Sequence, residues 1–175
     1  FSDDIVAPDL QLQKRIDENN DMIDDETRYM TYALREAEKA YDSGEVPVGC
    51  VIIHQGEVIG KAYNLRETLQ DPTADAEILA ITQAANHLKG WRLEDTRLYV
   101  TLEPCAMCAG AIILARVATV HFGATDPKAG CCGTLMNLLE DSRFNHQPEV
   151  TSGMMAAQCG EILSSFFRSI REAKK

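Results

Sequence analysis

The chain has 175 residues, a formal net charge of −10 and 45% hydrophobic residues, which suffice for one compact domain. No apolar stretch approaches the roughly 20 residues that a membrane-spanning helix needs, and no basic-then-apolar signal opens the sequence. We therefore expect a soluble, cytoplasmic protein. Its six cysteines are expected to be reduced, because a chain of this length does not need disulfides.

The first 25 residues form an acidic segment without a sustained hydrophobic period, with eight acids against two bases. This composition predicts a flexible extension, so we divide the chain into residues 1–25 and a domain over residues 26–175. The opposite end is basic, with Arg168, Arg171, Lys174 and Lys175. A net-acidic protein of this kind can still contact phosphate locally.

Hydrophobic periodicity and turn residues predict the elements in chain order. A helix over residues 26–41 precedes a hairpin of two strands, residues 46–54 and 57–64, joined at Gln55-Gly56. The remaining elements are a helix (74–88), a strand (97–102), a helix (105–115), a strand (119–123), a short helix (134–139), a weak strand (149–151) and a C-terminal helix (154–173). A hairpin followed by alternating helices and strands predicts an α/β fold with three layers, α/β/α, and a mixed five-stranded sheet.

Two acids stand two residues apart where the helix over residues 74–88 begins, in Asp75-Ala76-Glu77. Acids are common in the first turn of a helix, because they complement the positive end of the helix dipole. Taken alone, the pair can be an ordinary helix start.

A Cys-x-x-Cys pair, Cys105 and Cys108, follows directly after the strand over residues 97–102. Both thiols then lie in the first turn of a helix, where the dipole favours the thiolate form that binds metal. The spacing alone leaves metal binding, a redox dithiol and simple packing open.

The order Asp-x-Glu and then Pro-Cys-x-x-Cys resembles the zinc deaminase signature, which is His-x-Glu followed by Pro-Cys-x-x-Cys. From about residue 26 to residue 171 the chain is similar to the bacterial-type tRNA adenosine deaminases of the cytidine deaminase superfamily. The resemblance rests on Glu45-Val46-Pro47-Val48-Gly49, Tyr63-Asn64, Asp71-Pro72-Thr73-Ala74, Glu77, the run from Thr101 to Ala111, Phe122-Gly123-Ala124, Asn145-His146 and Phe166-Phe167-Arg168.

This resemblance implies a cytidine deaminase-like fold, a homodimer, one zinc ion per subunit, and conversion of the wobble adenosine in a tRNA anticodon stem-loop to inosine. Cys105 and Cys108 match zinc ligands, and Glu77 matches the residue that shuttles protons between the zinc-activated water and the leaving amine. The residues assigned to substrate binding on the same basis are Asn64, Val46, Ala76, Asp126, Phe167 and Arg168.

Asp75 stands where the family has histidine, which leaves three accounts of the first metal ligand. Asp75 ligates zinc itself, the site binds metal weakly or not at all, or another residue substitutes. The last account is the weakest, because about 18 Å of helix separates His87 from Asp75. An aspartate oxygen lies two bonds beyond Cβ, as does the histidine nitrogen that the family uses, and carboxylates are accepted zinc ligands. We therefore predict Asp75 as the third ligand, in a set more negative than the family's.

Two other functions stay open from the sequence. Deamination of a free base or nucleotide, of guanine or cytosine type, would use the same metal motif. A non-catalytic tRNA-binding subunit would explain the altered ligand, although such a subunit would not need the proton shuttle Glu77.

Overall fold

A computed structural model describes residues 24–175, and nearly all of the predicted extension, residues 1–23, lies outside the described residues. The elements in chain order are α2 (Asp25–Asp42), β1 (Gly49–His54), β2 (Glu57–Tyr63), α3 (Arg66–Leu69), α4 (Ala76–Leu88), β3 (Thr96–Leu102), α5 (Ala106–Ala115), β4 (Thr119–Ala124), β5 (Glu149–Ser152) and α6 (Ala156–Ala173). All of the predicted elements except the helix over residues 134–139 are present, and the short helix α3 is an addition.

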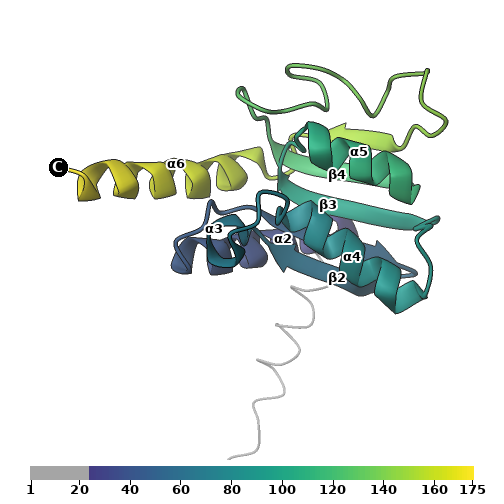
Figure 1. Cartoon of the computed structure of the whole chain (residues 1–175), viewed down its shortest axis with the longest axis horizontal. Helices are drawn as coiled ribbons and strands as arrows, with labels where there is room; N and C mark the ends of the chain where they lie inside the picture. Colours follow the sequence, from purple (N-terminus) through teal and green to yellow (C-terminus); the bar gives the residue numbers. More distant parts are fainter. Residues whose placement is uncertain (1–23) are drawn as a thin grey trace, which may run out of the picture.

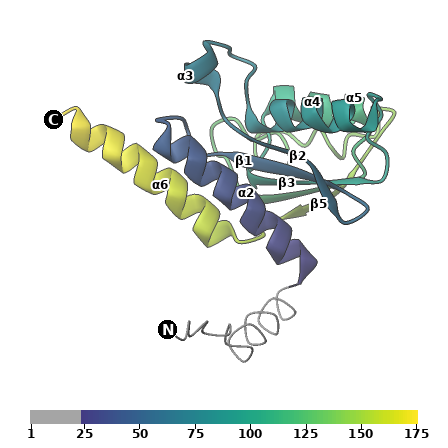
Figure 2. The same ribbon diagram turned by 90° about the horizontal axis from the view of Figure 1, so that it is seen from below.

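The five strands form one sheet in the order β2-β1-β3-β4-β5 (Figure 1). The β1 strand pairs antiparallel with both β2 and β3, whereas β3, β4 and β5 run parallel to one another. Figure 2 shows α4 and α5 on one face of the sheet and α2 and α6 on the other. The predicted α/β fold with three layers and a mixed five-stranded sheet is thereby confirmed.

Both faces of the sheet are covered by helices, so the middle of β1, from Cys50 to Ile53, is a continuous apolar run that does not alternate with polar residues. Along β1, Ile52 belongs to the cluster beneath α4 and α5, and Val51 and Ile53 belong to the cluster beneath α2. Gly49 opens this strand, and a Cβ there would overlap the carbonyl oxygen of Ala33. The glycine therefore lets α2 lie directly against the sheet.

The hairpin turn forms where it was predicted, but its first strand is shorter than expected. Gln55 and Gly56 have φ angles of 50° and 80°, the left-handed pair of a tight two-residue hairpin. The strand begins at Gly49 and not at residue 46, because Pro47 has no N–H and Val48 donates its own N–H to Val46 at 2.8 Å.

The helix predicted over residues 134–139 is wrong, and the segment is a series of turns. The N–H of Thr134 donates to the Glu103 carboxylate at 3.0 Å, and the N–H of Leu138 donates to the carbonyl of Cys131 at 2.9 Å. In a helix over residues 134–139 the N–H of Leu138 would instead bond to the carbonyl of Thr134, four positions back. The bonds to Glu103 and Cys131 therefore override the helical spacing of the apolar residues.

All six cysteines are free thiols, as predicted. Among residues 24–175, none of the helices has the length and apolar character that crossing a membrane requires.

Candidate active site

The starts of two helices bring three potential metal ligands together. Asp75 is the N-cap of α4, and Cys105 is the N-cap of α5, one turn before Cys108. One oxygen of Asp75, Oδ2, lies 3.6 Å from the Sγ of Cys105 and 3.5 Å from the Sγ of Cys108. The ligand atoms of the three residues all lie within 4.8 Å of one another.

The orientation of Asp75 differs from that of an ordinary acid at the start of a helix. An aspartate at the N-cap normally accepts a hydrogen bond from an N–H of the first turn. Asp75 makes no such bond, and its carboxylate faces the two sulfur atoms. One carboxylate and two thiols converging in this way fit the ligand chemistry of zinc, with a fourth tetrahedral position left over. His87 lies in the last turn of α4, so the predicted exclusion of this residue is consistent with the fold.

Glu77 is a buried carboxyl group one residue beyond the cluster, with 4% of its surface exposed. Burial raises the pKa of Glu77 to about 8, and the nearby charges of Asp75 and Cys105 act in the same direction. The side chain can therefore carry a proton near neutral pH, which an exposed glutamate cannot do.

The two thiols of the cluster differ in acidity. A hydrogen bond from Cys108 lowers the pKa of Cys105 to about 6, even though burial acts against this. The pKa of Cys108 is raised, because its proton is held by Cys105 and its site is desolvated. In the metal-free protein Cys105 is thus available as a thiolate near neutral pH. Cys108 must lose its proton when a metal binds.

A cavity of about 360 Å³ adjoins the cluster. It is lined by Glu45, Val46, Val48, Asn64, Arg66, Glu67, Asp75, Glu77, Leu102, Glu103, Cys105, Asp126 and Ala129. Its volume lies within the range of small-ligand sites, and it combines apolar walls with a few polar groups.

Asn64 projects from the end of β2 into this cavity. Its Oδ1 accepts the N–H of Ala76 at 2.9 Å, which fixes the orientation of the amide. The amide nitrogen has no hydrogen-bond partner among residues 24–175 and is left to face a ligand. Ala76 itself is fully buried and is absent from the cavity lining, so it acts on the site only by holding Asn64.

Two buried glutamates in the cavity wall, Glu45 and Glu103, belong to the sequence motifs, but the sequence predicted no role for them. Glu45 accepts hydrogen bonds from the N–H of Thr68 at 2.6 Å and from its hydroxyl at 2.7 Å. Glu103 accepts the N–H of Asp126 at 2.9 Å and the hydroxyl of Thr134 at 2.6 Å. Burial would raise the pKa of both carboxyls, but these hydrogen bonds outweigh it and lower both values. The two glutamates therefore stay ionised and fix the loops that frame the cavity.

Arg66 is a further residue that the sequence did not indicate. Its Nε lies 3.8 Å from the Oδ1 of Asp75, the oxygen that is turned away from the sulfur atoms. A cation at this position partly offsets the extra negative charge that the aspartate brings to the cluster.

A second cavity of about 530 Å³ shares Val46, Leu102 and Asp126 with the first. Phe167 and Arg168 of α6 line it, and 44% of the Phe167 surface is exposed. Asp126 closes its own turn by accepting the N–H of Lys128 at 2.9 Å. The substrate-binding residues predicted from the resemblance thus lie around two adjoining cavities, with the exception of Ala76.

Comparison with known proteins identifies the relatives of this chain. A family model described as MafB19-like deaminase matches residues 24–171. A protein of Bacillus subtilis named tRNA-specific adenosine deaminase is 58% identical over 147 residues, covering 84% of this chain and 91% of the relative. One of the same name from Streptococcus pyogenes is 46% identical over 153 residues, covering 87% and 96%. A solved structure from a study of A-to-I editing by tRNA wobble-position deaminases is 42% identical, with a TM-score of 0.76 over 78% of this chain and 99% of that chain. This likeness confirms the predicted cytidine deaminase-like fold.

Proposed function

The chain belongs to the MafB19-like deaminase family and, within it, to the tRNA-specific adenosine deaminases, and we propose how its residues convert the wobble adenosine of a tRNA to inosine. In this proposal Asp75, Cys105 and Cys108 hold one zinc ion. The observation that carries it is the Asp75 carboxylate, which faces two thiols instead of capping its helix. In this proposal residues 26–175 form the deaminase domain, whose first helix, α2, extends back to Asp25 with Asp24 as its N-cap.

A zinc ion held by these three residues would activate a water molecule at its fourth position. Glu77 accepts a proton from the water as the water oxygen attacks the carbon that bears the amino group. Glu77 then delivers a proton to the departing amine, so that ammonia leaves and inosine remains. Because Glu77 is buried, it can hold the proton away from bulk solvent between these two transfers.

The two adjoining cavities divide the substrate between them. The smaller cavity receives the flipped-out adenosine, where the free amide nitrogen of Asn64 donates to it and Val46 packs beside the base. The larger cavity receives neighbouring parts of the anticodon stem-loop, with Phe167 available for stacking and Arg168 for phosphate. Asp126 lies where the two cavities meet.

We also propose that the protein is a homodimer through the face formed by α4 and α5. The α5 helix has no charged residue, and Leu114 at its end is 70% exposed. A helix that is apolar on all sides is normally buried. Sedimentation should show a dimer for the unsubstituted protein (the parent) and a shift towards monomer for Leu114→Lys. A monomeric parent would contradict the proposed dimer.

The reaction is tested by incubating the pure protein with tRNA, free adenosine, guanine and cytidine, and measuring ammonia and inosine. Inosine should appear in the tRNA alone, with one ammonia released per inosine. Ammonia from guanine or cytidine without inosine in tRNA would support a free-base deaminase. Binding of tRNA without any ammonia would support a non-catalytic subunit.

A further inference from the structure

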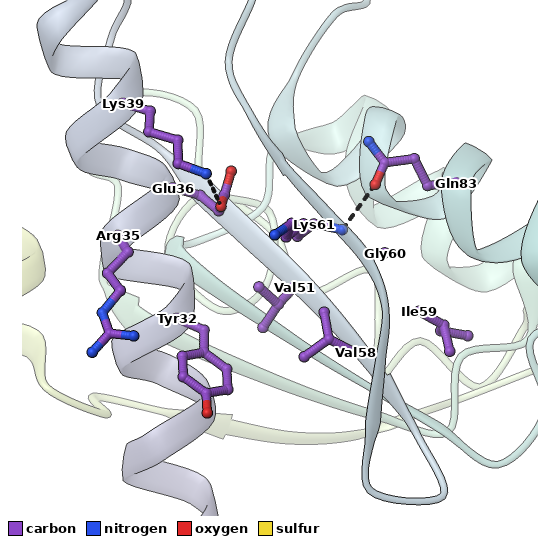
Figure 3. A pocket seen from close by; sticks show the side chains of 10 residues that line it. All are labelled: Tyr32, Arg35, Glu36, Lys39, Val51, Val58, Ile59, Gly60, Lys61 and Gln83. Atoms are coloured by element: carbon purple, nitrogen blue, oxygen red, sulfur yellow. Dashed lines mark hydrogen bonds and ion pairs between the residues drawn. The ribbon is translucent and has the colours of Figure 1, made fainter.

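A third cavity, of about 640 Å³, lies between α2 and the edge strand β2 (Figure 3). We call it the α2–β2 notch; it is lined by Tyr32, Arg35, Glu36, Lys39, Val51, Val58, Ile59, Gly60, Lys61 and Gln83. None of these residues lines the two cavities assigned to the adenosine and its neighbours. The proposed reaction therefore leaves the notch without a role.

The charges of the notch are opposite in sign to the charge of the whole chain. It holds three cations, Arg35, Lys39 and Lys61, and a single acid. That acid, Glu36, is 6% exposed and accepts a hydrogen bond from Lys39 at 2.7 Å. Within residues 24–175, no carboxylate lies within 4 Å of the charged groups of Arg35 or Lys61. The notch thus has an excess of two positive charges in a chain whose net charge is −10.

The edge of β2 is not free to pair with another peptide strand at this point. The backbone N–H of Lys61 already donates to the Oε1 of Gln83 in α4, at 2.9 Å (Figure 3). This bond occupies one of the main-chain donors on which strand addition depends. Recognition in the notch is therefore left mainly to its side chains, and these favour an anion.

The notch and the candidate active site lie close together along the chain but on opposite faces of the sheet. Lys61 of β2 precedes Asn64 by three residues, which is about 10 Å of extended chain, and side chains at this odd spacing point to opposite faces. A nucleic-acid strand carries about one phosphate per 3.4 Å of helix axis, so one RNA molecule that passes the edge of the sheet can place phosphates across a distance of about 10 Å. Arg35 lies over the ring of Tyr32, at 5.5 Å from its centroid, which leaves its N–H groups open to phosphate.

We propose that the α2–β2 notch binds the tRNA phosphate backbone outside the nucleotides that occupy the candidate active site. Arg35 and Lys61 make the contacts, and Lys39 is held in place by Glu36. This inference rests on the proposed function, since it takes tRNA as the substrate.

The test compares Arg35→Gln/Lys61→Gln with the parent in binding to full-length tRNA over a salt series. Both residues are exposed, so the double variant should fold normally. Its affinity should fall roughly tenfold, and the slope of log affinity against log salt should decrease by about 1 to 2. The kcat on saturating tRNA and the KM for a short anticodon-loop RNA should stay at the parent's values.

A matched control is Arg92→Gln/Arg143→Gln, which removes the same charge from two exposed arginines paired with Glu94 and Asp141. An equal loss of affinity in test and control would overturn the proposal, because it would show an effect of net charge alone. Unchanged tRNA affinity and salt slope would also overturn it, and the notch would then serve a small phosphate compound or no anion. A parent that binds tRNA without forming inosine would instead contradict the proposed function. The comparison of tRNA affinities between the test and control variants would still decide whether the notch binds tRNA.

Discussion

Glu77 has almost no contact with solvent, and the charges of Asp75 and Cys105 lie nearby. Such surroundings favour the protonated form, because both desolvation and like charge oppose ionisation. Burying a carboxyl group in this way lowers the stability of the fold, and such groups occur most often at functional sites. The place of Glu77 beside the Asp75–Cys105–Cys108 cluster supports proton transfer as its function.

We predict that Glu77→Gln abolishes inosine formation and leaves the zinc content of the protein unchanged. The glutamine keeps the size of the side chain but cannot carry the proton, and it is not one of the three ligands. Turnover should fall by at least 10²-fold, the lower end of what a general acid–base group contributes. Metal analysis and a tRNA assay on the same preparation check this, and loss of zinc in the variant would show that Glu77 is a ligand.

The same substitution should change the pH dependence of stability in the metal-free protein. The folded-state pKa of Glu77, about 8, lies above its ordinary value, so its contribution is fully present below pH 4.5 and is lost as pH rises through 8. Relative to the parent, metal-free Glu77→Gln should therefore gain on the order of 3 kcal/mol between pH 5 and pH 8. Urea denaturation at several pH values measures this, and parallel curves for the two proteins would contradict the raised pKa.

At the scale of elements, the site depends on how closely helices approach the sheet and on how two loops are held. Glu45 fixes the start of α3, and Glu103 fixes the loop that contains Asp126 and Thr134. Gly49, the first residue of β1, allows α2 to pack against this strand directly after Val48 of the cavity wall. These contacts set the shape of the cavity without touching a substrate.

We predict that Gly49→Ala destabilises the protein by roughly 1–3 kcal/mol. The new Cβ would meet backbone atoms of Ala33 and Ala37, which cannot move without shifting the whole helix. The control is Gly160→Ala in α6, where a Cβ has no atom within 4 Å and a slight gain in helix stability is expected. Equal unfolding free energies for the two variants would show that α2 does not pack as described.

The sequence was sufficient to predict the elements that depend on residues close together in the chain. Alternating strands and helices, the Gln55-Gly56 turn and the two helix starts all follow from residues that are close together in the chain. The failures arise from contacts between distant residues. The turns after Gly133 depend on Glu103, about 30 positions earlier, and the Arg66 contact to Asp75 depends on how the short helix α3 folds back. No local pattern contains that information.

At the scale of the whole molecule, the cations stand out against a net charge of −10. Arg168 and Arg171 of α6 line the larger cavity together with Lys128, and Arg35 and Lys61 line the α2–β2 notch. An acidic protein that binds a polyanion has to gather its cations where the ligand lies. The two groups of cations are therefore expected to act on tRNA binding and not on the chemistry.

We predict that Arg168→Gln/Arg171→Gln weakens tRNA binding. The slope of log affinity against log salt concentration should decrease by about 1 to 2. Zinc content should not change, because neither arginine lies in the metal cluster. The measurement is a salt series of tRNA affinity beside the Arg92→Gln/Arg143→Gln control. An unchanged affinity would mean that the end of α6 is only a solvated helix end.

The central claim is that Asp75 holds the metal, and metal analysis of Asp75 variants tests it most directly. The parent and Asp75→His should each contain one zinc ion per chain and form inosine, because both residues place a ligand atom two bonds beyond Cβ. Asp75→Ala and the equally sized Asp75→Asn should lose most of the zinc and most of the turnover, since neither supplies a charged oxygen to the two thiols. Stoichiometric zinc and full activity in Asp75→Ala would contradict the account, and Asp75 would then be only an acid at the start of a helix.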